Sequence, residues 1–236
     1  MKSRWFVIPN VRPQARLRLF CFPYAAGNAS TYLGWIEYLP EDVELVVVQP
    51  PGRANRIAET PINTMPDMVK QVADEMEALL DKPYCLFGHS LGSRVAFEVM
   101  LLARSKGWPM PRHYIASGSS APHVCREHKH VSHLTDEEFI EGLMRFDGPI
   151  EKIISNQELV ELFLPLLRAD FNIADTYSKQ PGVPLNVPFT VLGGCNDEDA
   201  MPHELPSWNQ HFSREGQIVL FEGNHFFIES AQSEVA

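Results

Sequence analysis

The chain has 236 residues, of which 44% are hydrophobic and 21% are charged, and its formal net charge is −10. This composition is that of a globular protein long enough for one sizeable hydrophobic core, and it excludes a disordered chain or a coiled coil. The negative charge argues against general binding of nucleic acid or anionic membranes, because both require basic surfaces.

No apolar run approaches the roughly 18 residues that a membrane span needs. The apolar stretch at residues 5–8 ends at Pro9 and is too short for a secretory signal. A cytoplasmic location is therefore expected. Because the cysteines are far apart and two lie in apolar, strand-like runs, we expect free thiols rather than disulfides at all four of them: Cys21, Cys85, Cys125 and Cys195.

Six short apolar runs, rich in β-branched and aromatic residues, predict strands that are buried on both faces. They cover residues 17–22, 43–48, 84–87, 113–116, 189–192 and 218–221. Helical patterns at residues 65–80 and 91–103 lie between some of these runs. This alternation predicts one α/β domain over residues 1–236, with a mostly parallel sheet flanked by helices.

The connection between residues 117 and 187 is too long for a single crossover. Two capping boxes, at residues 135–138 and 155–158, predict helices within it. The second helix is apolar nearly all round and contains Pro165, which should kink it. We interpret residues of about 122–183 as a helical lid insertion, and the alternative is an additional layer of the core.

The stretch FGHSLGS at residues 87–93 follows a predicted strand and precedes a predicted helix. It contains the pattern G-x-S-x-G of a nucleophile elbow, in which a serine occupies a strained turn between a strand and a helix. The glycines allow neighbouring backbone segments to approach closely. In this context we predict that Ser90 is a nucleophile, and the alternative is a serine in a structural turn.

A serine nucleophile needs a base and an orienting carboxylate, in the chain order Ser, Asp or Glu, His. His225 follows the last predicted strand, after a glycine and an asparagine that permit a turn towards the elbow. The loop after residues 189–192 offers several acids, of which Asp197 is our choice and Asp199 the runner-up. The end of the preceding strand, where other hydrolases hold this acid, has Ser117 instead.

The backbone N–H groups of Ala25 and Leu91 are the candidate oxyanion donors. Leu91 directly follows the nucleophile, and Ala25 lies in the loop after an early strand, a loop whose Pro and Gly residues would also build a plain turn.

Four histidines lie close together, but no HExxH pattern or cysteine pair accompanies them, so we expect no metal site: His123, His128, His130 and His133. A further loop, with Arg53 and Arg56, either lines the entrance of the site or is merely solvated.

Five stretches of the sequence are informative together: LFCFPYAAGNAS, VVVQPPGRANR, LFGHSLGS, LPLLRADF and FEGNHFF. In these stretches, and over nearly its full length, the chain resembles the stand-alone (type II) thioesterases that accompany nonribosomal peptide and polyketide synthases. The resemblance implies an α/β-hydrolase fold with a helical lid. It places a catalytic triad on Ser90, Asp197 and His225 and the oxyanion donors on Ala25 and Leu91.

The resemblance also implies the substrate, an acyl group on the phosphopantetheine arm of an acyl or peptidyl carrier domain. Hydrolysis would clear misprimed or stalled synthases and sometimes release product, with no cofactor beyond the arm that the substrate carries. Two positions depart from the family pattern. Ala26 stands where a second glycine is frequent, and Asn224 stands where GGHFF is usual, so the two loops are expected to differ in geometry.

Carrier domains of this kind are usually acidic, so a chain with a charge of −10 needs a local basic or apolar docking patch. Arg53, Arg56 and Arg94 are the candidate docking residues, and we expect the protein to act as a monomer. The alternative functions are an acyl-CoA thioesterase or carboxylesterase acting on free small molecules, and a hydrolase-fold protein that binds without catalysis.

Overall fold

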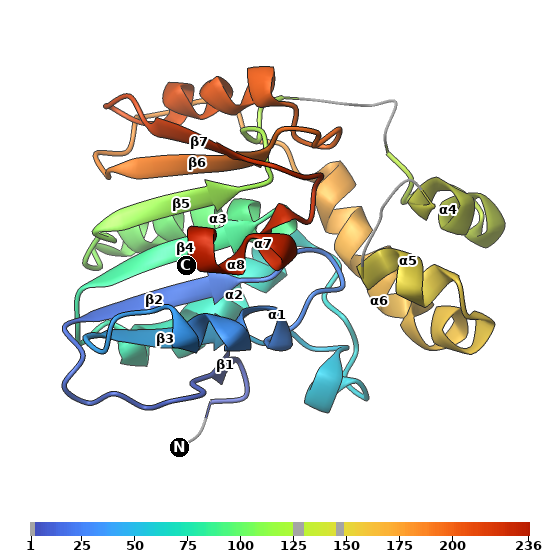
Figure 1. Cartoon of the computed structure of the whole chain (residues 1–236), viewed down its shortest axis with the longest axis horizontal. Helices are drawn as coiled ribbons and strands as arrows, with labels where there is room; N and C mark the ends of the chain where they lie inside the picture. The colour runs from blue at the N-terminus through green and yellow to red at the C-terminus, as the bar shows by residue number, and fades with distance from the viewer. Residues whose placement is uncertain (1–2, 125–129, 145–148) are drawn as a thin grey trace.

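A computed structural model describes residues 3–124, 130–144 and 149–236. Its strands form one seven-stranded sheet in the order β1-β3-β2-β4-β5-β6-β7 (Figure 1). All neighbouring strands are parallel except the pair β1 and β3. The strands are β1 (Phe6–Val7), β2 (Leu17–Phe22), β3 (Val43–Val48), β4 (Tyr84–His89), β5 (His113–Ser117), β6 (Phe189–Gly194) and β7 (Gln217–Phe221).

The six predicted strands are confirmed as β2 to β7, and the sheet is mostly parallel as expected. The strand β1, in which Phe6 lies opposite Val48, was not predicted. A strand of two residues is too short to show a period of hydrophobicity.

Helices cover both faces of the sheet. In Figure 1, α2 and α3 lie behind the strands, and α1, α7 and α8 lie in front of them. The α-helices are α1 (Ser30–Leu33), α2 (Met65–Met76), α3 (Leu91–Lys106), α4 (Asp136–Leu143), α5 (Pro149–Ile154), α6 (Gln157–Thr176), α7 (Phe227–Ser230) and α8 (Gln232–Val235). The 3-10 helices are η1 (Gly34–Glu37), η2 (Ala54–Arg56), η3 (Glu77–Leu79) and η5 (Pro202–His211). In the part of the chain described, no helix is both long and apolar enough to cross a bilayer.

The predicted insertion contains α4, α5 and α6, which gather at one end of the sheet (Figure 1). The capping box at the start of α4 is confirmed, since the Glu138 N–H donates to the Thr135 hydroxyl and the Thr135 N–H donates to the Glu138 carboxylate. The capping box predicted at Ser155 is wrong. Asn156 caps α6 instead, because Ser155 still closes α5 by donating its N–H to the carbonyl of Glu151.

Helix α6 continues through Pro165 and has two different halves. In the first half Leu162 is 55% exposed, whereas in the second half Leu167 is fully buried and Phe171 is 5% exposed. The second half packs into the body of the protein, whereas Phe163 and Leu164 in the first half are only half-buried against the core.

Candidate active site

Ser90 lies between β4 and α3 in a strained backbone conformation, with φ 53 and ψ −120. The two glycines around it are required by close contacts. A Cβ on Gly92 would lie 2.1 Å from the carbonyl oxygen of Phe22, and one on Gly88 would lie 2.3 Å from the carbonyl oxygen of Gly92. Positive φ at a non-glycine residue is costly and concentrates at functional sites, so the turn has the geometry of a nucleophile elbow.

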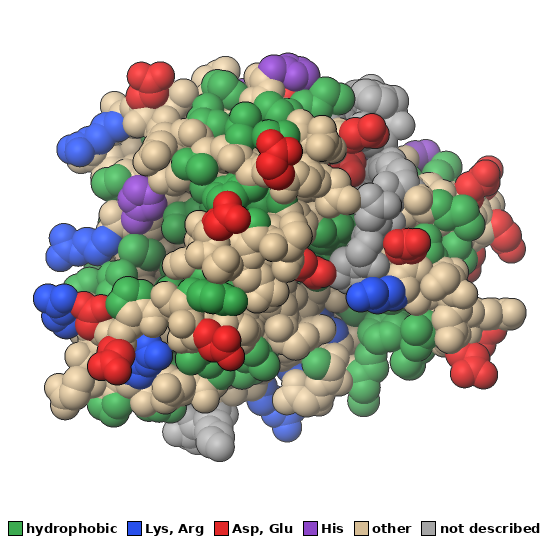
Figure 2. Space-filling view, in the orientation of Figure 1, with side chains coloured by type: hydrophobic (Ala, Val, Ile, Leu, Met, Phe, Trp, Pro, Cys, Tyr) green, Lys and Arg blue, Asp and Glu red, His purple; other side chains and the backbone are tan. Residues whose placement is uncertain are grey.

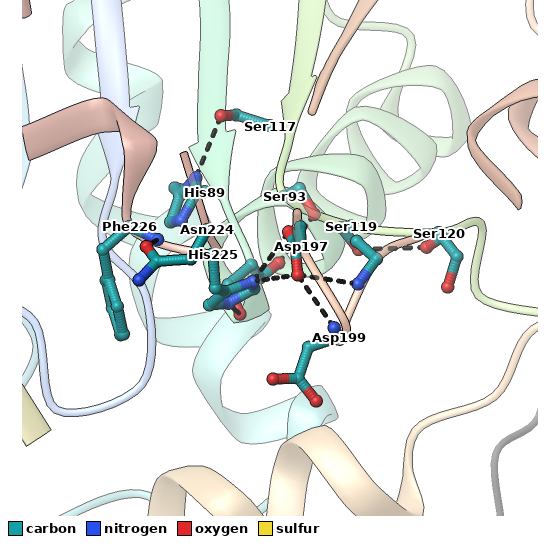
Figure 3. Close-up of polar contacts among 12 residues, drawn as sticks. His89, Ser93, Ser117, Ser119, Ser120, Asp197, Asp199, Asn224, His225 and Phe226 are labelled. Atoms are coloured by element: carbon teal, nitrogen blue, oxygen red, sulfur yellow. Dashed lines mark hydrogen bonds and ion pairs between the residues drawn. The ribbon is translucent and has the colours of Figure 1, made fainter. Parts of the chain in front are cut away.

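Ser90, His225 and Asp197 form one hydrogen-bonded chain. Nε2 of His225 lies 2.9 Å from Oγ of Ser90, and Nδ1 lies 2.9 Å and 3.1 Å from the two carboxylate oxygens of Asp197. His225 comes from the segment after β7 and Asp197 from the loop after β6, and Figure 3 shows the two side chains facing each other. The three residues predicted from sequence are thus brought together at the carboxyl ends of β4, β6 and β7.

The Asp197 carboxylate is 2% exposed and is held by its own loop. Its Oδ1 accepts hydrogen bonds from the N–H groups of Asp199 at 2.8 Å and Ala200 at 2.9 Å. Burial acts to raise the pKa of Asp197, but the charge and hydrogen bond of His225 and the two N–H donors together outweigh it, so the pKa lies below its ordinary value. An ionised carboxylate is what an orienting acid requires. The hydrogen bond to Nδ1 is made by Asp197, and Asp199 contributes its backbone to that carboxylate.

The two predicted oxyanion donors line the same cavity as Ser90. Ala25 and Leu91 are 7% and 5% exposed, and neither backbone N–H donates to another described residue. Buried N–H groups are normally paired, and an oxyanion hole is one reason for leaving them open. Their placement fits the predicted role.

His89, the second residue of the elbow, was not assigned a role from the sequence. It is fully buried, its Nδ1 lies 2.9 Å from Oγ of Ser117, and its ring centroid lies 5.1 Å from that of His225. Burial, and next the charge of His225, lower the pKa of His89 to about 3, so the ring is neutral at physiological pH. The position that carries the acid in other hydrolases is therefore occupied by a serine that orients this neutral ring (Figure 3).

The candidate site opens into a cavity of about 140 Å³. Ser90 and His225 lie on one side of it, and Phe171, Ala174 and Tyr177 from the insertion line the other side. A cavity of this size is comparable to one that holds a benzene ring. The insertion thus forms a wall of the site, as a lid would, although lid movement stays a prediction.

The expectation that Arg53 and Arg56 belong to an exposed docking patch is wrong. Arg53 is 2% exposed and pairs with Asp170, and Arg56 is 7% exposed and pairs with Glu59. Both guanidinium groups are paired with carboxylates of the protein itself, because a buried guanidinium needs a partner. Arg94 is half-buried in the cavity wall, where its guanidinium donates to the carbonyl of Ala174.

Asp and Glu side chains gather around the insertion on the face in Figure 2. The exposed acids on the insertion helices include Glu137, Glu141, Glu151, Glu158 and Glu161. The described part of the insertion helices therefore presents many acidic side chains, which would repel an acidic partner.

Among the described residues one group has the spacing of metal ligands, Asp197, Asp199 and His225, with ligand atoms within 4.8 Å of one another. Two of its members already bond to each other in the chain that reaches Ser90. Of the histidines considered from sequence, His128 lies outside the described residues and His123 bonds to His211. Cys21, Cys85 and Cys195 are free thiols, as expected, and Cys125 also lies outside the described residues.

Comparison with known proteins gives one family. A model of the thioesterase domain matches residues 17–236. The gramicidin S biosynthesis protein GrsT of Aneurinibacillus migulanus is 35% identical over 233 residues, which cover 99% of this chain and 91% of that protein. Most of both chains is therefore shared.

Solved structures agree with the sequence comparisons. The thioesterase RedJ from the prodiginine biosynthetic pathway in Streptomyces coelicolor superposes with a TM-score of 0.86 and 36% identity, covering 94% of this chain and 87% of that one. YbtT, described as a type II thioesterase of the yersiniabactin pathway, gives a TM-score of 0.85 and 32% identity, covering 98% and 94%. The sheet and its flanking helices are thus those of thioesterases with the α/β-hydrolase fold.

Proposed function

The chain belongs to the thioesterase family and is a hydrolase of thioesters, and from that premise we propose that it removes acyl groups from the phosphopantetheine arm of carrier domains in a nonribosomal peptide or polyketide synthase. The support for the partner comes from relatives whose descriptions name such pathways. The support for the chemistry is one observation, the hydrogen-bonded chain from Asp197 through His225 to Ser90.

The first half of the proposed reaction acylates the serine. His225 Nε2 takes the proton of Ser90 Oγ while that oxygen forms a bond to the thioester carbonyl carbon. The N–H groups of Ala25 and Leu91 stabilise the oxyanion. The carbon–sulfur bond then breaks, and the thiolate leaves with the proton from His225. A thiol is acidic enough that this proton transfer makes light demands on the imidazole.

The second half hydrolyses the acyl-enzyme. Water attacks the same carbonyl carbon as His225 accepts one of its protons, and collapse of the oxyanion returns that proton to Ser90 Oγ and releases a carboxylic acid. Asp197 keeps the Nδ1 proton in place and stabilises the imidazolium in both halves. The proposed chemistry uses only protein groups and water.

We also propose that this reaction takes place in the cytoplasm, where carrier-bearing synthases are made. The three described cysteines are free thiols, which suits a reducing compartment.

The proposal is tested by presenting one acyl group in three forms: on a carrier domain, on coenzyme A and as a simple ester. We expect the highest kcat/KM with the carrier domain. Equal values for all three would refute carrier specificity and favour a thioesterase or esterase of free small molecules. The matched control is Ser90→Ala, which should reduce turnover of every form to background; activity that persists in this variant would refute the assigned nucleophile.

A further inference from the structure

A buried ion pair lies next to the proposed oxyanion hole and takes no part in the proton transfers described above. Arg53 follows β3, and Asp170 belongs to α6 of the insertion; they are 2% and 0% exposed. Nη1 and Nη2 of Arg53 donate to the two carboxylate oxygens of Asp170 at 2.8 Å and 2.9 Å. Two parallel hydrogen bonds fix the relative orientation of the groups as well as their distance.

Both members of this pair also hold the loop that follows Ala25. The Ala26 N–H donates to Oδ2 of Asp170 at 2.7 Å, and Nη1 of Arg53 donates to the carbonyl of Gly27 at 3.0 Å. The ion pair therefore binds one backbone donor and one backbone acceptor of the loop, both within two residues of the proposed oxyanion donor.

The loop needs such support because its conformation is unfavourable. Ala26 has a φ of 62, which L residues rarely adopt. A second cavity, of about 20 Å³, lies against the loop, and its lining includes Tyr24, Leu91 and both members of the pair. The packing on this side is thus incomplete, and the loop has room to shift if the pair is removed.

Stability alone is a poor explanation for this arrangement. Replacing a buried ion pair by apolar residues of similar volume is often neutral or stabilising. We propose that Arg53 and Asp170 are positioning residues that aim the Ala25 N–H at the developing oxyanion, so that the insertion takes part in stabilising the transition state. This inference rests on the function proposed above.

The test uses the full-length protein with two kinds of substitution. Asp170→Asn removes the charge but leaves an amide oxygen for the Ala26 N–H. The double variant Arg53→Met with Asp170→Leu removes both charges without leaving either buried alone, so we expect it to fold even if the single variant does not. The control is Glu44→Gln, which weakens the buried pair of Arg18 and Glu44 at the opposite, amino-terminal ends of β2 and β3.

The measurements are kcat and KM for an acetyl thioester of N-acetylcysteamine, and the affinity for a trifluoromethyl ketone. The ketone forms a tetrahedral adduct with Ser90 whose oxygen occupies the oxyanion position. Loss of an oxyanion donor lowers kcat by about a hundred- to a thousandfold, so a misplaced donor is expected to lower it about ten- to a hundredfold. The affinity for the ketone falls by a similar factor, while KM stays within about threefold of wild type because the ground state barely uses this donor.

Three results would overturn the inference: a folded double variant with wild-type kcat, a reduced kcat with unchanged ketone affinity, or an equal loss of kcat in Glu44→Gln. Measuring Ser90→Ala in the same assay distinguishes failure of this inference from failure of the proposed function. An active Ser90→Ala protein refutes the proposed function, whereas an inactive one beside a fully active double variant refutes only the role of the pair.

Discussion

The substitution Asp197→Asn should abolish most activity through the tautomer of His225. Oδ1 of Asp197 accepts from the N–H groups of Asp199 and Ala200 at 2.8 Å and 2.9 Å, so the oxygen of an asparagine is drawn to that position. Its NH₂ group then occupies the place of Oδ2, 2.9 Å from Nδ1 of His225. A donor there requires Nδ1 to be unprotonated and therefore places the proton on Nε2.

With its proton on Nε2, His225 is unable to accept the proton of Ser90. The same change in a serine protease triad lowers kcat by about 10⁴-fold, which corresponds to about 5 kcal/mol in the barrier. The assay is steady-state hydrolysis of an acyl thioester at neutral pH, with Asp199→Asn as the control. Asp199→Asn keeps the backbone N–H that supports Asp197 and should retain at least a tenth of wild-type kcat. The reasoning is refuted if Asp197→Asn retains a tenth of wild-type kcat, or if Asp199→Asn loses as much as Asp197→Asn.

Two further outcomes concern stability. Burial lowers the pKa of His89 to about 3, and burial, with the charge of His123 next, lowers that of His211 to about 4. Between these values and about 6.5 the unfolded chain binds a proton that the folded chain does not, so the free energy of unfolding should fall with decreasing pH, by about 1.4 kcal/mol per pH unit for each histidine. Urea unfolding at several values between pH 7 and pH 5 measures this slope, and a flat profile would contradict it. Separately, Gly92→Ala places a Cβ 2.1 Å from the carbonyl oxygen of Phe22 and should prevent accumulation of folded protein. The control Gly182→Ala meets nothing within 4 Å and should change the unfolding free energy by less than about 0.5 kcal/mol. A normal melting temperature for Gly92→Ala would show that the elbow tolerates a side chain.

Much of the fold could be predicted because its strongest signals are local. Continuous apolar runs identified all strands from β2 to β7, and the capping box at Thr135 identified α4. Elements without a hydrophobic period, such as η5, gave no signal. The error at Ser155 arose because two good capping residues are adjacent, and the end of α5 decides between them.

The site was predictable as far as chain order and strand ends define it. Ser90, Asp197 and His225 follow the carboxyl ends of β4, β6 and β7, and parallel strands bring such positions together. The role of Arg53 was not predictable, because its partner Asp170 lies 117 residues further along the chain. An arginine after a strand suggests an exposed charge until the fold supplies the carboxylate that buries it.

The contact between α6 and the loop after β2 limits how this protein can be recombined. A chimera that exchanges residues 122–183 for those of a relative, in order to change the acyl group accepted, also replaces Asp170. Its donor sequence must therefore bring an equivalent carboxylate to Arg53, or the Ala26 N–H loses its acceptor and the Arg53 guanidinium that binds the Gly27 carbonyl loses its buried partner. Crossover points should be chosen so that Arg53, Asp170 and the loop with Ala26 and Gly27 are inherited from a single parent.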